Sequence, residues 1–199
     1  SVEALVRWDH PTRGLVPPLQ FIPLAEESGA ILQIGSWVLD QACAQLAAWR
    51  AAGGPADLCI GGNLSVAQLE QEGLLAEVER TLLVHGLEAS ALTLEVTESV
   101  LAANVDLVQL QLSGLSALGV RLALDDFGTG YSSLGYLQHF QLDTLKIDKS
   151  FVCDTKDPLQ QEGLVRAIIE LANNRGMSTV AEGVEEPDQL EMLARLGCT

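Results

Sequence analysis

The chain has 199 residues, of which 48% are hydrophobic and 19% are charged, a composition that suits a globular domain with a sizeable core. Its formal net charge is −16, with 11 basic residues against 27 acidic ones. Because neutralising a nucleic-acid backbone needs clustered Lys and Arg, this balance argues against DNA or RNA binding.

Short apolar runs alternate with longer amphipathic stretches along the whole chain. The apolar runs contain few polar positions, as expected for strands that are buried on both faces. The predicted strands are Ala4–Trp8, Leu58–Asn63, Leu92–Val96, Arg121–Asp125, Thr144–Asp148 and Thr179–Glu182. The predicted helices are Pro18–Glu27, Gly35–Ala52, Ala67–His85, Val105–Leu118, Pro158–Asn174 and Pro187–Leu196. This alternation predicts one α/β domain, residues 1–199, built on a parallel sheet.

The parallel sheet can be open or closed. A closed (β/α)8 barrel needs eight strands and about 250 residues, so this chain suits either an open sheet or a barrel without its end pieces. Ligand-type polar residues stand at or just past the ends of successive predicted strands: Asn63, Glu95, Glu98, Asp125, Asp126, Lys146, Asp148, Glu182 and Glu185. Such groups converge at the C-terminal mouth of a barrel, where barrel enzymes do their chemistry, and we therefore favour the barrel.

The cysteines and histidines show no metal-site spacing. Cys43, Cys59, Cys153 and Cys198 form no C-x-x-C pair, and we interpret them as reduced thiols, mostly in the core.

No apolar run reaches the roughly 20 residues of a membrane span. We expect a cytoplasmic location, either as a free protein or as the cytoplasmic part of a membrane-anchored one. The helix predicted over Val105–Leu118 suits core packing and a partner surface equally well.

The adjacent carboxylates Asp125 and Asp126 are the most informative feature of the chain. They follow the apolar run Val120–Leu124 and precede a loop rich in glycine. Two carboxylates at the end of a buried strand are costly unless a cation neutralises them, and oxygen ligands suit Mg²⁺ or Mn²⁺. The simpler interpretation is a strand that ends in two solvated aspartates.

Further polar residues complete an oxygen-rich shell. Glu3, Asn63, Glu95 and Asp125 can hold one ion, and Asp126 can reach a second ion that Asp125 bridges. Two neighbouring ions suit displacement at phosphorus. Three other residues have candidate roles in that reaction: Lys146 as the residue that holds or polarises the water, Glu182 as general base or further ligand, and Arg7 as a phosphate contact.

Several motifs in order resemble those of EAL domains, the cyclic di-GMP phosphodiesterases. The matching segments are Glu3–Trp8, His10-Pro11, Pro18–Glu26, Asn63–Ser65, Leu94–Glu98, Asp125–Leu134, Leu145–Asp148 and Ala181–Glu185. The resemblance covers essentially the whole chain. It implies a (β/α)8 TIM-like barrel of the EAL type with one antiparallel strand.

The resemblance also implies an activity and a set of roles. It implies hydrolysis of cyclic di-GMP to linear pGpG with Mg²⁺ or Mn²⁺, two ions in all, in bacterial second-messenger signalling. The implied metal ligands are Glu3, Asn63, Glu95, Asp125 and Asp126. The other implied roles fall on Lys146 and Glu182 in catalysis, Arg7 and Leu5 at the substrate, Glu98 as anchor of the Asp125–Leu134 loop, and Glu185 as a further site member. A homodimer and companion sensory or cyclase domains outside this chain are implied as well.

The chain departs from the family pattern at its ends. Only Ser1 and Val2 precede Glu3, and the chain stops at Thr199, so we expect the first strand and the last βα piece of the barrel to lie outside it. Two alternatives stay open. One is a receptor that binds cyclic di-GMP without hydrolysis, and the other is an enolase-type barrel enzyme with Lys146 as a proton-abstracting base.

Overall fold

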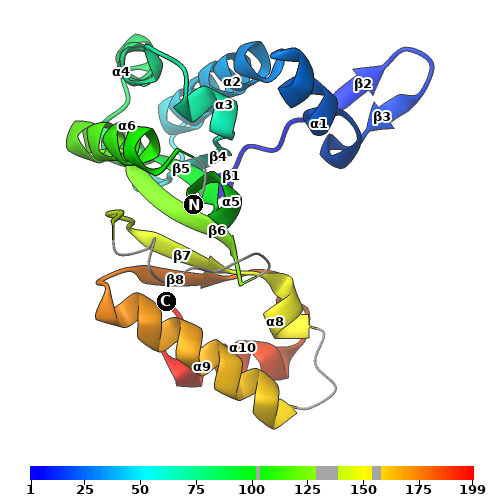
Figure 1. The fold of residues 1–199 in the computed structure, drawn as a ribbon, viewed down its shortest axis with the longest axis vertical. Helices are drawn as coiled ribbons and strands as arrows, with labels where there is room; N and C mark the ends of the chain where they lie inside the picture. Colours follow the sequence, from blue (N-terminus) through cyan, green and yellow to red (C-terminus); the bar gives the residue numbers. More distant parts are fainter. Residues whose placement is uncertain (102–103, 129–138, 154–157) are drawn as a thin grey trace. The chain divides into compact units, whose positions relative to one another are not determined.

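The computed structural model describes residues 1–101, 104–128, 139–153 and 158–199 (Figure 1). The chain divides into two compact units. The first comprises Ser1–Glu95 and Asn104–Arg121, and the second comprises Val96–Ala103 and Leu122–Thr199. Parallel strands and buried apolar side chains occur in each unit, which is the α/β organisation predicted from the sequence.

The first unit contains a parallel sheet and a separate hairpin. Its strands are β1 (Val2–Glu3), β2 (Trp8–His10), β3 (Gly14–Val16), β4 (Ile60–Asn63) and most of β5 (Leu92–Thr97). Its helices are α1 (Pro18–Ser28), α2 (Ile31–Ala51), α3 (Val66–Leu69), α4 (Leu74–His85), the 3-10 helix η1 (Ala89–Ala91) and α6 (Val105–Leu118). Strands β1, β4 and β5 are parallel neighbours in that order, and β2 pairs with β3 in an antiparallel hairpin.

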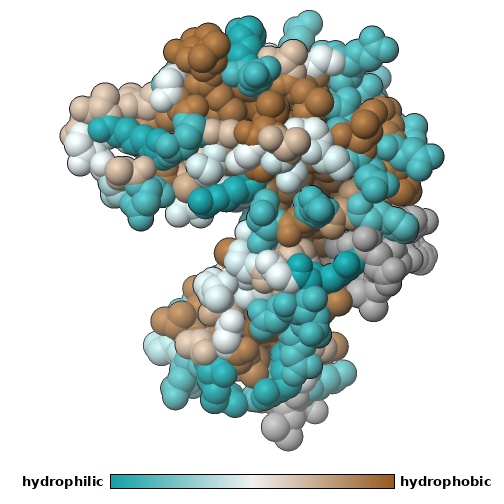
Figure 2. All heavy atoms as spheres, turned by 90° about the vertical axis from the view of Figure 1, so that its left-hand side faces the viewer, coloured by the Kyte–Doolittle hydropathy of each residue, from teal (hydrophilic) through white to brown (hydrophobic). Residues whose placement is uncertain are grey.

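Helices α2, α4 and α6 form the helical layer of the first unit. Cys43 and Leu46 of α2 are completely buried, and α2 packs on both β4 and α4. Helix α6 packs on α4 and buries Val108, Leu112 and Leu115. This helix is therefore a core-packing element, although Leu110 on it is 69% exposed. Figure 2 shows apolar patches set among hydrophilic side chains on the face of the molecule seen there.

The single helix predicted over Ala67–His85 is wrong, because two helices occupy this stretch. Ser65 caps α3 through a reciprocal capping box with Gln68, and α3 ends at Leu69. Helix α4 starts after Gly73, whose φ of +97° lies in the left-handed region that glycine adopts without strain. The apolar period continues across the break, and for this reason the sequence pattern did not reveal it.

The second unit also combines parallel strands with helices. It contains α5 (Glu98–Leu101), most of β6 (Arg121–Phe127), β7 (Thr144–Ile147), α8 (Lys149–Cys153), α9 (Pro158–Asn174), β8 (Ser178–Ala181) and α10 (Pro187–Leu196). Strands β6, β7 and β8 are parallel neighbours in that order. Leu122, Leu124, Leu145 and Ile147 are completely buried, as predicted for strands covered on both faces.

Asp143 fastens the N-terminal ends of all three strands of the second unit. Its carboxylate accepts a hydrogen bond of 2.8 Å from the N–H of Leu122, and its own N–H donates to the Leu122 carbonyl at 2.8 Å. Its carbonyl accepts from the N–H of Ser178 at 2.9 Å. The strand register, and hence the level at which each strand ends, is fixed by these contacts.

The predicted helices over Val105–Leu118, Pro158–Asn174 and Pro187–Leu196 are confirmed, as are five of the predicted strands to within two residues. The strand predicted over Ala4–Trp8 is wrong. The strand is Val2–Glu3, and the chain leaves the sheet after the Ala4 N–H bonds to the Gly61 carbonyl at 2.8 Å. Trp8 instead starts the β2–β3 hairpin, where it makes an edge-to-face contact with Phe21.

The cysteines are free thiols, as expected. Cys43 and Cys59 are buried, Cys153 is exposed and Cys198 is intermediate. Among the described residues, no helix combines the length and the apolar character that crossing a membrane would require.

Leu46→Ala tests the packing of α2. We expect it to lower the free energy of unfolding by about 2–5 kcal/mol, because it opens a cavity at a completely buried position. Leu83→Ala is the matched control, since Leu83 lies on α4 with 80% of its surface exposed, and should change stability by less than about 0.5 kcal/mol. Urea unfolding measures both, and equal losses would contradict the burial described.

Candidate functional site

In the first unit, Glu3 and Asn63 meet at the ends of neighbouring strands. Strand β1 ends at Glu3 and β4 ends at Asn63, and the register sets Glu3 opposite Gly61. The Asn63 side-chain N–H donates to Glu3 Oε1 at 2.8 Å. Both residues are exposed, so their oxygens stand at an accessible edge of the sheet.

Glu95 lies deeper in the same sheet, opposite Asn63 on the neighbouring strand. It is only 6% exposed, an unusual environment for a carboxylate. A Cβ at Gly61 would lie 2.6 Å from Glu95 Oε1, so glycine is needed there for the carboxylate to approach β4. Sequence reasoning missed this role of Gly61. The Gly61-Gly62 pair within an apolar strand was the available signal, because glycine in a strand often marks a close approach.

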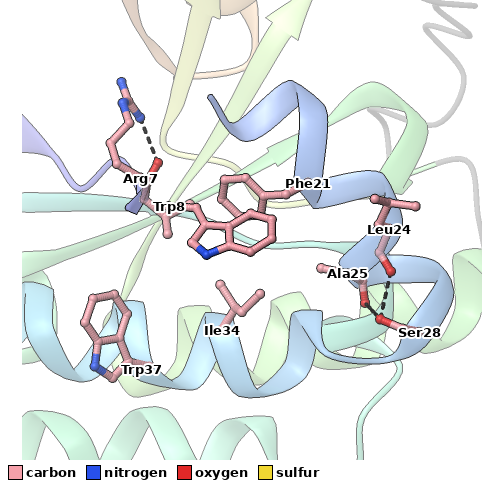
Figure 3. Close-up of a pocket in the computed structure, with 9 residues that line it drawn as sticks. Arg7, Trp8, Phe21, Leu24, Ala25, Ser28, Ile34 and Trp37 are labelled. Carbon is pink, nitrogen blue, oxygen red and sulfur yellow. Dashed lines mark hydrogen bonds between the residues drawn. The ribbon is translucent and has the colours of Figure 1, made fainter. Parts of the chain in front are cut away.

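The candidate substrate residues Leu5 and Arg7 lie in the segment that joins β1 to β2. Leu5 is 54% exposed, and the Arg7 guanidinium donates to the Val6 carbonyl at 2.8 Å. Arg7 also lines an apolar cavity of about 430 Å³ (Figure 3). The lining residues are Val6, Arg7, Trp8, Phe21, Leu24, Ala25, Ser28, Ile34 and Trp37. Such a cavity suits a flat, weakly polar group, with Arg7 as the charged residue of its wall.

In the second unit, the Lys146 ammonium lies between two carboxylates. Lys146 Nζ is 3.0 Å from Asp125 Oδ1 and 2.8 Å from Glu182 Oε1. Lys146 and Asp125 are buried, at 7% and 9% exposure, whereas about a third of the Glu182 side chain is exposed. Lys146 sits on β7, between β6 with Asp125 and the end of β8 before Glu182. The ion pairs therefore join the three strands at one level.

Asp126 completes an acidic cluster with Asp125 and Glu182, whose oxygens lie within 4.8 Å of one another. The β6–β7 register shifts between Leu124 and Phe127, and Asp126 has a φ of +52°, rare for a residue with a side chain. Burial, followed by repulsion from Asp125, raises the pKa of the Asp126 carboxyl above its usual value. Asp126 is exposed, so its positive φ and the neighbouring carboxylates, more than enclosure, make its position unfavourable.

Two further predicted residues of this unit lie at the start of α5 and on the loop before α10. Glu98 Oε1 accepts a hydrogen bond of 2.8 Å from the N–H of Gly128, directly after β6. Residues 129–134 of the loop that Glu98 is predicted to anchor lie outside the described residues. The Glu185 N–H donates to Gln189 Oε1 at 2.8 Å, and its carboxylate is not part of the acidic cluster found among the described residues.

Both sets of residues fit divalent metal ions by their donor chemistry. Glu3, Asn63 and Glu95 in one unit, and Asp125 and Asp126 in the other, offer carboxylate and amide oxygens, which hard cations prefer. The closeness of Asp125, Asp126 and Glu182 favours a cation, because a bound cation would offset the repulsion between these carboxylates.

Comparison with known proteins gives a consistent result. The sequence model of the EAL domain matches residues 1–199. The chain is 49% identical over 198 residues to the bifunctional diguanylate cyclase/cyclic di-GMP phosphodiesterase MucR of Pseudomonas aeruginosa, covering 100% of this chain and 29% of MucR. It is 45% identical over 198 residues to the cyclic di-GMP phosphodiesterase NbdA of the same organism, covering 100% of this chain and 25% of NbdA. The chain thus spans less than a third of these relatives.

Solved structures agree with the sequence relatives. A structure of the PaMucR phosphodiesterase in complex with c-di-GMP is 48% identical, with a TM-score of 0.91 over 99% of this chain and 79% of that one. The FimX EAL domain from Pseudomonas aeruginosa, bound to c-di-GMP, is 25% identical with a TM-score of 0.89, covering 99% of this chain and 78% of that one. These likenesses confirm the predicted α/β fold of the EAL type.

Lys146→Met tests the ion pairs. We expect it to lower the free energy of unfolding by about 3–5 kcal/mol without divalent cations, because it leaves a buried carboxylate without its counter-charge. Added Mg²⁺ should restore part of this loss, since a cation can replace the ammonium. Lys149→Met, at an exposed position three residues along, is the control. Thermal unfolding with chelator and with Mg²⁺ measures the effect, and equal behaviour of both variants would refute a buried, paired Lys146.

Proposed function

Because the chain belongs to the EAL domain family, we propose that it hydrolyses cyclic di-GMP to linear pGpG with the help of divalent metal ions. The observation that carries this proposal is the buried Lys146 ammonium held by Asp125 and Glu182 beside a third carboxylate, Asp126. A candidate base, an ammonium and further carboxylates close together suit phosphodiester hydrolysis, since that reaction needs an activated water and neutralised charge at phosphorus.

The proposed metal ligands are Glu3, Asn63, Glu95, Asp125 and Asp126, and the proposed ions are Mg²⁺ or Mn²⁺, two in number. When bound, such ions neutralise the phosphate charge and help water to lose its proton. The all-oxygen character of the set supports hard cations over zinc, for which nitrogen and sulfur ligands are usual.

Glu182 and Lys146 are the proposed catalytic residues. The Glu182 carboxylate accepts a proton from the attacking water as the water oxygen bonds to phosphorus. The bond between phosphorus and the ribose oxygen breaks, and that oxygen leaves as a hydroxyl after taking up a proton from solvent. Lys146 holds Glu182 through its contact of 2.8 Å and balances its charge, which fixes the direction in which the base points. The same ammonium also contacts Asp125, one of the proposed metal ligands. About a third of the Glu182 side chain is exposed, so the base is accessible to substrate.

Arg7 and Leu5 are the proposed substrate contacts. Cyclic di-GMP carries two phosphodiester charges, and a protein of net charge −16 must supply local cations to hold it. The planar donor fork of Arg7 suits a phosphate oxygen. The exposed Leu5 offers an apolar surface to the nucleoside.

The proposal extends to the intact protein. We infer that residues 1–199 form one EAL phosphodiesterase domain of a cytoplasmic or membrane-anchored protein that works as a homodimer. We also infer companion sensory or cyclase domains. The name of MucR, which combines a diguanylate cyclase with a phosphodiesterase, supports this last inference.

Removal of a metal ligand is the first test. We expect Glu3→Ala and Asp125→Asn in the full-length protein each to lower the rate of pGpG release by at least about 100-fold, because each removes an oxygen from the proposed ion shell. Chelator should abolish release by the unsubstituted protein, and Mg²⁺ or Mn²⁺ should restore it. Asp57→Asn is the control, because Asp57 is an exposed carboxylate that is not among the proposed site residues. Undiminished turnover in either ligand variant would remove that residue from the metal site.

Glu182→Gln separates catalysis from binding. We expect hydrolysis to fall by about 10²–10⁴-fold, the usual contribution of a general base. Calorimetric binding of cyclic di-GMP should persist, because the amide keeps the shape of the side chain. Full activity would exclude Glu182 as the base, and lost binding would assign it a structural role. If the unsubstituted, folded protein binds cyclic di-GMP but releases no pGpG, the chain is a receptor.

A further inference from the structure

The loop that carries Glu182 joins β8 to α10 and is held by contacts with α8. Glu182 directly follows Ala181, the last residue of β8, and its N–H donates to the Ile147 carbonyl at 3.0 Å. Beyond that contact the loop runs over four exposed residues before α10 starts at Pro187. Its position therefore depends on side-chain contacts.

Gln189, in the first turn of α10, makes most of these contacts. Its Oε1 accepts from the N–H of Glu185 at 2.8 Å and from the N–H of Glu186 at 2.9 Å. Its Nε2 donates to the Val152 carbonyl of α8 at 3.3 Å and lies 4.0 Å from Cys153 Sγ. One amide thus joins the Glu182 loop to the C-terminal end of α8.

A second contact joins the same two segments one residue from Glu182. The Cys153 thiol donates to the Gly183 carbonyl at 2.8 Å. A Cβ on Gly183 would come within 2.5 Å of Lys149 Cβ, so the loop backbone lies directly against α8. The φ of +67° at Gly183 adds to this requirement for glycine.

Helix α8 is itself tied to Lys146. It starts at Lys149, immediately after Asp148 and the end of β7, and only two residues separate Lys146 from the helix. The 2.8 Å contact between Lys146 and Glu182 therefore closes a ring that runs through α8, Gln189 and the loop. A shift of the loop away from α8 would lengthen that contact.

We propose that Gln189 is a positioning residue that holds Glu182 against Lys146 through the end of α8, an inference that rests on the hydrolytic function proposed above. The geometry of a general base matters steeply, since a misplacement of about 1 Å can cost 10²-fold in rate. Gln189 touches neither substrate nor metal in this assignment. It acts through the loop.

A simpler role for Gln189 is the ordinary capping of α10. It forms a capping box with Glu186, and both glutamate and glutamine occur at its position in such boxes. Gln189→Glu separates the two roles. The carboxylate can still accept from the N–H groups of Glu185 and Glu186, but it cannot donate to the Val152 carbonyl and repels it instead.

Gln161 of α9 provides the matched control. Its side-chain amide donates to the carbonyls of Phe151 and Val152, so it contacts the same end of α8 without touching the Glu182 loop. Gln161→Ala therefore removes an amide donor from the same carbonyl and leaves the loop contacts in place.

The experiment compares steady-state hydrolysis of cyclic di-GMP by the full-length protein and these two variants. We expect Gln189→Glu to lower kcat by about fivefold or more, with KM within about twofold, because the base is displaced while substrate contacts remain. Gln161→Ala should keep kcat within about twofold of the unsubstituted value. A wild-type kcat in Gln189→Glu, or an equal loss in Gln161→Ala, would overturn the proposal.

Amide hydrogen exchange gives a readout that does not need activity. In the Gln189→Glu protein, amides 183 and 184, which do not bond to residue 189, should exchange at least about threefold faster than in the Gln161→Ala protein, since the loop loses its hold on α8. Equal exchange in both variants would overturn the link between Gln189 and α8. If the unsubstituted protein releases no pGpG, the proposed function fails, and the exchange result still decides whether Gln189 holds the loop.

Discussion

A buried ammonium imposes the main constraint on the second unit. Lys146 is almost completely enclosed on the central strand of its three, where an unpaired charge would cost several kcal/mol. Asp125 on one side and Glu182 on the other offset this cost, but only if β6, β7 and β8 end at matching levels. The contacts of Asp143 at the opposite ends of these strands set those levels. The strand register therefore also determines the geometry of the site.

The same arrangement gathers three carboxylates, those of Asp125, Asp126 and Glu182, around one ammonium. Lys146 faces Asp125 and Glu182, and its attraction for Asp126 is smaller than the burial and repulsion that raise the pKa of that carboxyl. The left-handed φ of Asp126 adds a local backbone cost. Proteins commonly keep such unfavourable features where a ligand will relieve them, at the expense of stability without the ligand. Asp126 is the residue at which this trade-off is most visible.

The sequence predicted which strand-end residues lie close together better than it predicted the chain path around them. Asp125, Lys146 and Glu182 were found because each stands at the end of an apolar run, and parallel strands bring such ends together. The break before Gly73 was missed because the apolar period runs through it. Gln189 was missed for a different reason. Its helix position is readable from the sequence, but its contact with Val152 joins segments 37 residues apart, and only the folded chain brings them together.

The geometry of Lys146 also bears on the enolase-type alternative. A lysine that abstracts a proton must first be neutral and have a free direction towards the substrate. Here the ammonium points at Asp125 Oδ1 and Glu182 Oε1, at 3.0 and 2.8 Å, and losing its proton would leave two carboxylates facing an amine. Such a group orients and neutralises rather than accepts protons. Glu182 is the more exposed of the two partners of Lys146, which supports the proposal that Glu182, rather than the buried Asp125, is the base.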